Sequence, residues 1–219
     1  MTAERGQGED TRQRLIEAAT REFATHGVHA GSLLEITRQA GQRNRGAVHY
    51  HFGSREGMLV AVLETRVEYL AARERELLAI ARQRPDDDLA SVVQAFVRPA
   101  VELGDLGWEG RCYLVILAEL VEDDRERLDP EIVAALERTG GWETFELLGA
   151  RTPPMPDELR AERLSLVTGF IMRAAADRAR NRERSMARPQ LETEQFIVNL
   201  IAMVVGMLAA PVPVADDKP

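Results

Sequence analysis

The sequence is poor in cysteine and in aromatic residues. Cys112 is the only cysteine among 219 residues, which excludes an internal disulfide and a cysteine-based zinc site and predicts a buried structural thiol. Aromatic residues make up only 5% of the chain, so the places where they gather are informative. A nucleophile elbow, a phosphate-binding glycine loop and a metal motif are also missing. We therefore expect no enzyme, no catalytic residue, no metal and no cofactor.

Long apolar runs are scarce as well. The segment before residue 15 lacks the apolar core of a signal peptide. The longest candidate, Phe196 to Ala210, has 15 residues before Pro211, fewer than the roughly 20 that a membrane-spanning helix needs. We expect a cytoplasmic protein with no membrane segment, in which this stretch is covered on one side by its own chain and on the other by a second subunit.

Charge is unevenly distributed along the chain. The formal net charge is −8, but the first 55 residues hold eight arginines against six acidic residues, a net of +2, which leaves −10 for the remainder. All four histidines also lie in this first part. A weakly basic end on an acidic body suits a protein that places one end on phosphates and keeps the other away from them.

Helical periodicity runs through the whole chain without an internal repeat, and it predicts an all-α fold of about nine helices. A loose arm precedes the first helix, and residues 151–156, RTPPMP, form a stiff linker. The glycine pair Gly140-Gly141 marks either a bend or an early stop in a helix over residues 130–148. The predicted helices span about residues 10–26, 33–40, 45–52, 55–84, 89–103, 108–121, 130–148, 157–184 and 190–210. The basic end of the eighth helix, residues 178–188, is interpreted as a solvated helix C-terminus.

The segment from Ser32 to Arg55 predicts two short helices joined by a tight turn. Ser32 and Glu35 form a capping box at the start of the first helix, and Gly41 ends it in a left-handed conformation. Asn44 is a good N-cap for the second helix, which has a polar outer face. This is the helix-turn-helix pattern, whose second helix enters the major groove of DNA. An ordinary helical hairpin with a polar face is the alternative.

The order and spacing of residues over positions 10 to 60 resemble the N-terminal domain of the tetracycline-repressor (TetR) family of bacterial transcription regulators. The residues that carry the resemblance are Thr11-Arg12, Leu15 to Ala19, Phe23, Gly27, Ile36, Ala40-Gly41, Tyr50 to Glu56 and Leu59. The resemblance implies a three-helix DNA-binding domain in residues 1–54 and an effector-binding and dimerisation domain in residues 55–210. We expect residues 211–219 to be a disordered tail.

The start of the second short helix is where base-reading side chains are needed. Arg45 can bond a guanine edge in a bidentate way, and Ala47 offers its methyl group to a thymine. Arg55 opens the next helix, where its charge and the free amides would face a phosphate. By resemblance, Arg5 in the arm can touch the minor groove. The predicted DNA-contact residues are Thr11, Arg43, Asn44, Arg45, Gly46, Ala47, His49, Tyr50, His51 and Arg55. A metal site at His49 and His51 is not predicted, because residues two apart lie on different sides of a helix.

The resemblance also implies a pocket between the central helices that binds a small effector. The large apolar residues gathered there are the candidates for its lining: Phe96, Trp108, Tyr113, Trp142, Phe145 and Met172. Plain core packing is the alternative for each of them.

Together these features predict a homodimeric, ligand-responsive regulator that represses transcription from a palindromic operator in double-stranded DNA. Its last two long helices would form a four-helix dimer interface. The resemblance implies a lever, in which a small-molecule effector shifts the long helix after Ser54 and separates the two DNA-reading ends. The alternative is a helical small-molecule-binding protein without a role on DNA.

Overall fold

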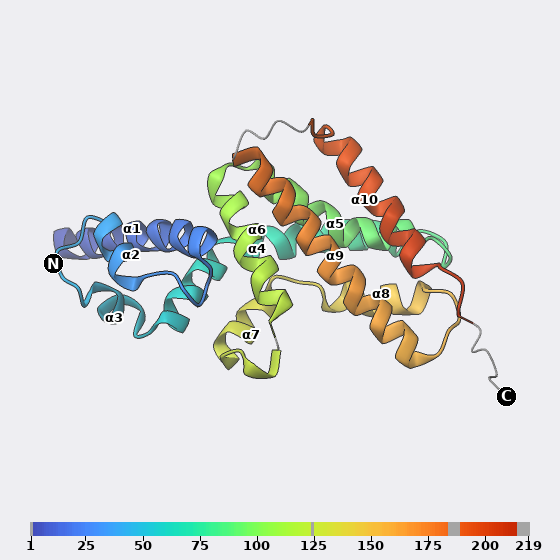
Figure 1. The fold of residues 1–219 in the computed structure, drawn as a ribbon, viewed down its shortest axis with the longest axis horizontal. Coiled ribbons are helices and arrows are strands. Elements are labelled where there is room, and N and C mark those ends of the chain that lie inside the picture. Colours follow the sequence, from blue (N-terminus) through green and yellow to red (C-terminus); the bar gives the residue numbers. More distant parts are fainter. Residues whose placement is uncertain (1, 124, 184–188, 214–219) are drawn as a thin grey trace.

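The computed structural model describes residues 2–123, 125–183 and 189–213, and these residues form ten α-helices and one short 3-10 helix. Helices α1–α3 make a small head at one end of the molecule, helices α5–α10 make the body, and α4 runs between them (Figure 1). The helices are α1 (Thr2–His26), α2 (Leu33–Gln39), α3 (Ala47–Phe52), α4 (Arg55–Ala81), α5 (Leu89–Asp105), α6 (Trp108–Glu122), α7 (Pro130–Arg138), α8 (Trp142–Arg151), α9 (Asp157–Glu183) and α10 (Thr193–Leu208), with the 3-10 helix at Arg125–Arg127.

Helix α1 braces the head. Its inner stripe of Leu15, Ile16, Ala19 and Phe23 is buried, as the spacing of these residues predicts. The expected loose arm is wrong, because α1 already begins at Thr2. The glycines of this segment are single and no proline follows them, so nothing in the sequence stops the helix from extending backwards. The side chain of Arg5 lies outside the described ones.

Helix α4 joins the head to the body. Ser54 caps it, since its hydroxyl accepts a hydrogen bond from the Gly57 amide at 3.1 Å. The helix packs against α1 and α3 at the head and against α5 and α7 in the body. Its buried residues are Met58, Leu59, Ala61, Val62, Leu63, Leu70, Glu74, Leu77, Leu78 and Ala81. One rigid element therefore carries part of the core of both ends.

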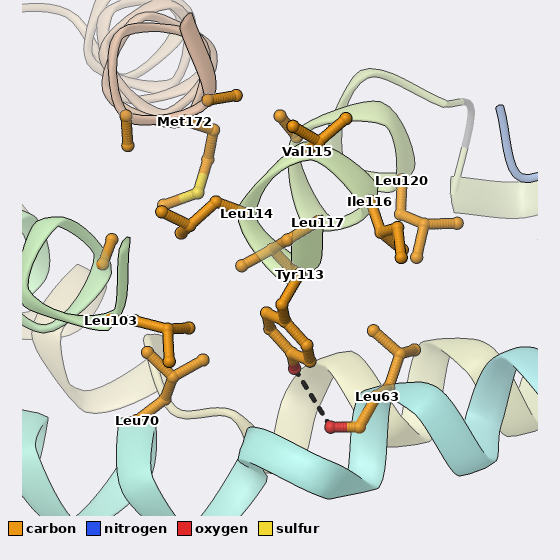
Figure 2. Packing of buried hydrophobic residues seen from close by; sticks show 14 of the residues in the cluster. Leu63, Leu70, Leu103, Tyr113, Leu114, Val115, Ile116, Leu117, Leu120 and Met172 are labelled. Carbon is orange, nitrogen blue, oxygen red and sulfur yellow. Dashed lines mark hydrogen bonds between the residues drawn. The ribbon is translucent and has the colours of Figure 1, made fainter. Parts of the chain in front are cut away.

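Helix α6 packs against α1, α4, α5 and α9, and Figure 2 shows its buried side chains from close by. Its predicted apolar run is buried, with Tyr113 among the least exposed residues of the protein. The Tyr113 hydroxyl donates a hydrogen bond to the Leu63 carbonyl on α4 at 3.1 Å. Burial raises the pKa of this hydroxyl, so Tyr113 stays protonated and remains a donor at any physiological pH.

The glycine pair Gly140-Gly141 stops a helix. Both glycines have positive φ, 105° and 101°, which other residues rarely adopt. The single helix expected over residues 130–148 is therefore wrong, its early-stop alternative is confirmed, and the chain gains a tenth helix. Glu74 of α4 holds the turn, because its Oε1 accepts hydrogen bonds from the Gly141 amide, at 2.8 Å, and from the Thr144 hydroxyl. We call Glu74 with these two partners the Glu74 hook.

Two arginines expected on the surface are buried. Arg151 belongs to α8 rather than to a linker, and its guanidinium donates to the carbonyls of Asp88 at 3.0 Å and Ala81 at 2.9 Å. Arg178 donates to the Leu191 carbonyl at 2.9 Å and lies 4.6 Å from the ring centre of Phe196. The basic end of α9 is therefore not simply solvated, because Arg178 fastens the start of α10. Residues 184–188 of that segment lie outside the described residues.

Helix α10 is buried on one face only. Ile197, Leu200, Val204 and Leu208 face the body. On the opposite face, Val198 is 57% and Met203 is 48% exposed. In the chain as described, with residues 1, 124, 184–188 and 214–219 excepted, no helix is long and apolar enough to cross a bilayer.

The Glu74 hook predicts a measurable loss of stability. Glu74→Ala leaves the Gly141 amide and the Thr144 hydroxyl without their acceptor inside the protein, which we expect to lower the free energy of unfolding by about 1–3 kcal/mol. Glu74→Gln is the matched control, because its amide oxygen can accept both hydrogen bonds. Urea unfolding at one fixed protein concentration measures the difference. Equal losses in the two variants would show that the hook does not hold the turn.

The same carboxyl group predicts a pH dependence. Burial raises the pKa of Glu74 above its ordinary value of 4.5. The folded state therefore holds the proton more tightly, and this stabilising contribution is lost as pH rises from about 4.5 through the raised folded value. Glu74→Gln cannot titrate, so we expect the wild type to lose stability relative to this variant across that window. A constant difference between the two proteins would contradict the raised pKa.

Candidate functional site

The helix-turn-helix forms as the sequence predicts, with changes at both caps. The Glu35 amide donates to the Ser32 hydroxyl at 3.3 Å, which is one half of the predicted capping box. The other half is made by Glu22 of α1, whose Oε1 accepts from the Ser32 amide at 2.9 Å. Gly41 has a φ of +70° and ends α2 as expected. This hydrogen bond from the Ser32 amide to Glu22 holds the N-terminus of α2 against α1.

The turn before α3 is longer than predicted. Helix α3 begins at Ala47, so Arg45 lies in the turn rather than in the first turn of the helix. The Asn44 side chain accepts from the Gly46 amide at 2.9 Å, while Gly46 occupies the N-cap position without a side-chain hydrogen bond. Asn44 therefore shapes the turn instead of capping the helix, because an asparagine side chain readily bonds the backbone two residues on.

The exposed members of the predicted DNA-contact set all lie in the turn before α3 or on α3 itself. Arg43, Asn44, Arg45, His49 and Tyr50 are exposed, and Tyr50 reaches 83%. The half-buried members are Thr11, Gly46, His51 and Arg55. The predicted contact of Ala47 with DNA is wrong. Ala47 is only 5% exposed because its methyl group packs into the core of the head, so this methyl group cannot contact a thymine.

The aromatic and imidazole side chains of α3 are arranged around its C-terminal turn. His49 Nδ1 lies 2.8 Å from the Gly53 carbonyl, which fixes the ring against its own helix. The rings of Tyr50 and His51 meet edge to face, with centroids 4.9 Å apart. Tyr50 therefore stands out from the surface with one flank supported, an arrangement suited to contact with a sugar-phosphate backbone.

The arginines in the turn before α3 carry a positive charge that is not balanced by an acidic side chain within the described residues. Arg38 is paired with Glu35 at 2.6 Å, and the hydrogen bonds from Arg38 and Gln39 lower the pKa of Glu35 to about 2. Arg38 is thus neutralised at physiological pH. Within the described part of the chain, Arg43 and Arg45 have no acidic partner. Their charge is available to an anion from outside.

Arg55 has a structural role that the sequence did not reveal. Its Nη1 donates to the Val28 carbonyl at 3.1 Å, in the loop between α1 and α2. Its guanidinium carbon also lies 5.8 Å from the centre of the Phe23 ring. Arg55 therefore opens α4 as predicted, but its orientation is set by a loop that lies 27 residues earlier in the chain.

The body holds a cavity of about 280 Å³ between α5, α6, α7, α8 and α9. Four of the six predicted pocket residues line it: Phe96, Trp142, Phe145 and Met172. Phe96 and Phe145 meet edge to face at 5.3 Å, and Trp142 stands at the rim, 75% exposed. The remaining lining residues, which sequence reasoning missed, are Leu117, Leu120, Val121, Asp123, Arg125, Leu128, Leu136, Glu137, Thr139, Gly140, Gly141 and Thr168.

The prediction that Trp108 and Tyr113 line the pocket is wrong for this cavity, because neither residue is in its lining. The ring of Trp108 is covered by the guanidinium of Arg21, 3.5 Å from its centre, where α1 meets α6. Tyr113 is core, and its hydroxyl is used by the Leu63 carbonyl. A second, larger hollow of about 490 Å³ lies near this junction, and Cys112 lines it as a half-buried rather than a buried thiol. Its arginines, histidine and glutamate make it polar, unlike the body cavity.

Two family models match the chain. The model described as "Bacterial regulatory proteins, tetR family" matches residues 15–62. The model described as "Tetracyclin repressor-like, C-terminal domain" matches residues 94–207, which is more than half of the chain. Between them they cover both the head and most of the body.

Individual relatives agree with these models. The transcriptional regulator SrpR of Pseudomonas putida is 45% identical over 60 residues, which are 27% of this chain and 28% of that protein. The probable regulator ArpR of Pseudomonas putida is 31% identical over 127 residues, or 58% of this chain and 50% of that protein. The matches with these curated relatives thus extend over half of their length or less.

A solved structure shares the fold. The regulator FadR from Bacillus subtilis, in complex with stearoyl-CoA, superposes with a TM-score of 0.53 over 92% of this chain and 99% of its own. The two sequences are 15% identical, so the likeness concerns the arrangement of helices alone.

Arg45 and Arg55 should fail in different ways when changed to alanine. Losing Arg45 should cost about 1–3 kcal/mol per half-site and relax the preference at one base position, because a guanidinium can read the guanine edge. Losing Arg55 should weaken all sequences alike, flatten the salt slope by about one unit per half-site and lower the thermal stability of the head. Titrations on an operator and on its single-base substitutions, at several salt concentrations, separate the two outcomes.

Arg38→Ala is the matched control, because this neighbouring arginine is already paired with Glu35. We expect it to change neither the base preference nor the salt slope appreciably. If Arg45→Ala loses affinity evenly on every substituted site, Arg45 contacts phosphate and does not read a base.

Proposed function

The chain belongs to the TetR family of bacterial regulatory proteins, and we propose that it is a homodimeric repressor that leaves its operator when a small molecule binds the body. The observation that carries the proposal is the pair of arginines at the turn before α3. Arg43 and Arg45 are exposed and, among the described residues, have no acidic partner, whereas Arg73 of α4 and Arg98 of α5 are paired with glutamates. A surface built to meet phosphates leaves its cations unpaired in this way.

The alternative, a helical small-molecule-binding protein without a DNA role, does not account for this surface. Such a protein has no use for an exposed tyrosine and two uncompensated arginines on a helix-turn-helix. The relatives that match are named as transcriptional regulators, and an enzymatic activity has no support from any of them.

The proposed DNA contacts are those that the head leaves accessible. They are Thr11, Arg43, Asn44, Arg45, Gly46, His49, Tyr50, His51 and Arg55. The head is proposed to act as a DNA-binding domain in residues 1–54 and the body as an effector-binding and dimerisation domain in residues 55–210. Residues 214–219 of the proposed tail lie outside the described residues. Because the proposed target is double-stranded operator DNA, we place the protein in the cytoplasm.

The body cavity is the proposed effector site. Its aromatic and aliphatic walls suit an apolar molecule with a ring that fits between Phe96, Phe145 and Trp142. Arg125 and Glu137 at the opening bind each other at 2.5 Å, so neither is an uncompensated anchor for a charged ligand. We therefore propose a neutral, aromatic effector.

The Glu74 hook supports a lever through α4. The turn at Gly140-Gly141 lines the cavity and is fastened to Glu74, which lies on the helix that enters the head. A ligand that displaces the turn pulls on α4 and alters the separation of the two heads in the dimer. Heads that cannot reach successive major grooves together lose most of their joint affinity.

The test of the function is binding to the DNA upstream of the protein's own gene. We expect specific binding that weakens steeply with salt, with a slope of at least about −4 in log K against log salt, because each neutralised phosphate contributes roughly −0.9. N-phenyl-1-naphthylamine, a neutral aromatic dye that fluoresces in apolar surroundings, is the probe for the cavity. A salt slope near zero, or no specific binding at all, would contradict the DNA role.

The dimer is proposed to form through α9 and α10. Val198 and Met203 on α10 and Leu166 on α9 are exposed apolar residues that the chain itself leaves uncovered. A second copy that brings the same two helices would cover them in a four-helix interface around a two-fold axis.

Val198→Asp and Met203→Asp should each give a folded monomer. A carboxylate at an exposed position leaves the inner face of α10 intact but places an unpaired charge in the proposed interface. These positions are better probes than the half-buried Ile201 and Val205, whose change also disturbs the core of the chain. Leu106→Asp is the control, since Leu106 is 59% exposed but lies outside α9 and α10. Sedimentation that shows unchanged dimers in both α10 variants would refute this interface.

A further inference from the structure

The loop between α1 and α2 is held by the body at two points. The Val28 amide donates a hydrogen bond to Glu119 Oε1 at 3.0 Å. The neighbouring His29 Nε2 lies 2.9 Å from Asp123 Oδ2. Both acids belong to the C-terminal end of α6, at its last turn and its cap. We call Glu119 and Asp123, with their partners Val28 and His29, the α6 latch.

The backbone of the α1–α2 loop and the Glu119 carboxylate lie close together at the latch. Gly27, just before Val28, has a φ of +92°, and a Cβ built on it would lie 3.1 Å from Glu119 Oε1. Val28 itself is buried, so its amide has no access to water and depends on Glu119 for its hydrogen bond. The pair of His29 and Asp123 is more exposed and is screened by solvent. Glu119 is therefore the stronger of the two holding points.

The loop passes this constraint on to a proposed DNA-contact residue. Arg55 donates a hydrogen bond to the Val28 carbonyl at 3.1 Å. The amide of Val28 is therefore held by Glu119 and its carbonyl by Arg55. A shift of Glu119 moves Val28, and a shift of Val28 moves the acceptor that orients the Arg55 guanidinium. Two hydrogen bonds therefore lead from Glu119 on α6, through Val28, to Arg55.

The other side of the same helix end forms the wall of the body cavity. Leu117, Leu120, Val121 and Asp123 line the cavity, and Glu119 lies between them in the sequence. Asp123 takes part in both structures, since it lines the cavity and also faces His29 of the head. A ligand in the cavity would therefore contact the element that carries the latch.

We propose that the α6 latch transmits occupancy of the body cavity to the head, with Glu119 as the positioning residue for Arg55. This inference rests on the proposed function, which supplies the ligand and the operator. It differs from the lever, because it reaches the head through the α1–α2 loop and does not require α4 to move. In the empty protein the latch keeps the Arg55 guanidinium in the orientation that contacts a phosphate of the operator. A ligand that displaces the end of α6 breaks the latch, and the Arg55 guanidinium loses that orientation.

The first test needs no ligand and uses operator affinity of the full-length dimer. Glu119→Ala removes the acceptor of the Val28 amide, and we expect the operator affinity to fall by about fivefold or more, the range of typical coupling between sites. Glu119→Gln should restore it, because the amide oxygen can accept the same hydrogen bond. Glu122→Ala is the matched control on the same turn of α6, since the Glu122 carboxylate lies 3.8 Å from Arg173 of α9.

A double-mutant cycle then asks whether Glu119 acts through Arg55. In an Arg55→Ala background, Glu119→Ala should cause little further loss, because the side chain that it positions is already missing. Losses that simply add would overturn the proposal. A thermal unfolding midpoint for each variant shows that the head is still folded, and an affinity loss in Glu119→Ala that Glu119→Gln does not restore would also count against the latch.

The second test measures the effect of N-phenyl-1-naphthylamine on operator affinity in the wild type and in Glu119→Ala, because Glu119 holds the α1–α2 loop but does not line the cavity. We expect the dye to bind both proteins but to lower operator affinity much less in the variant. An equal reduction in both, or a dye that occupies the wild-type cavity without effect, would overturn the latch. If the wild type binds no operator, the proposed function fails instead. If the dye does not bind, the proposed cavity ligand fails and the double-mutant cycle decides the latch.

Discussion

The hydrogen bond from the Tyr113 hydroxyl to the Leu63 carbonyl joins α6, which packs against the head and most of the body, to α4, which runs between the two. It lies in the first half of α6 and is surrounded by buried leucines, as Figure 2 shows. A densely packed interior resists deformation, so this buried half of α6 is the part least free to shift relative to α4. The last turn of α6 and its cap, from Glu119 to Asp123, lie against the cavity and the head loop instead. Any displacement of α6 relative to α4 is therefore concentrated at this end.

Two connections lead from the cavity to the head, and each uses one carboxylate, buried at Glu74 and half-buried at Glu119. Glu74 fastens the glycine turn to α4, and Glu119 fastens the α1–α2 loop to α6. A hydrogen bond to a charged group contributes about 1.5–3 kcal/mol, and allosteric coupling typically amounts to about 1–3 kcal/mol. One such bond, made in the empty state and lost in the occupied state, is therefore enough to account for a ligand response. A ligand shifts the equilibrium only as far as its affinities for the two states differ.

The sequence predicted the parts of the fold that depend on local signals. The cap at Ser54, the glycine ends of α1 and α2 and the apolar run of α6 all formed where their residues indicate. The exposed face of the head also follows from periodicity, apart from Ala47. Helix α3 starts two residues later than Asn44 suggested, and this shift turns the alanine methyl inward. An uncertainty of one or two residues in the start of a short helix is enough to reverse such an assignment.

What the sequence could not predict were contacts between residues far apart in the chain. Glu22 replaced Glu35 in the capping box, Arg55 met Val28, and Arg178 turned inward to meet Leu191. The choice among several equally placed acceptors depends on the packing of helices, which periodicity does not specify. The same limit explains the pocket residues, because Phe96 and Phe145 were recognisable as large apolar residues while Trp108 and Tyr113 had the same character and a different place.

The acidic character of the body also acquires a physical role. Several of its acidic residues form ion pairs that join one helix to another. The pairs are Glu102 with Arg73 of α4, Glu194 with Arg98 of α5, and Glu143 with Arg82, which follows α4. These pairs occupy arginines that would otherwise attract DNA to the body, and the excess of acid repels it. The turn before α3 is the contrasting case, because Arg43 and Arg45 keep their charge uncompensated. A net charge of −8 is thus compatible with DNA binding, provided that the encounter is restricted to the head.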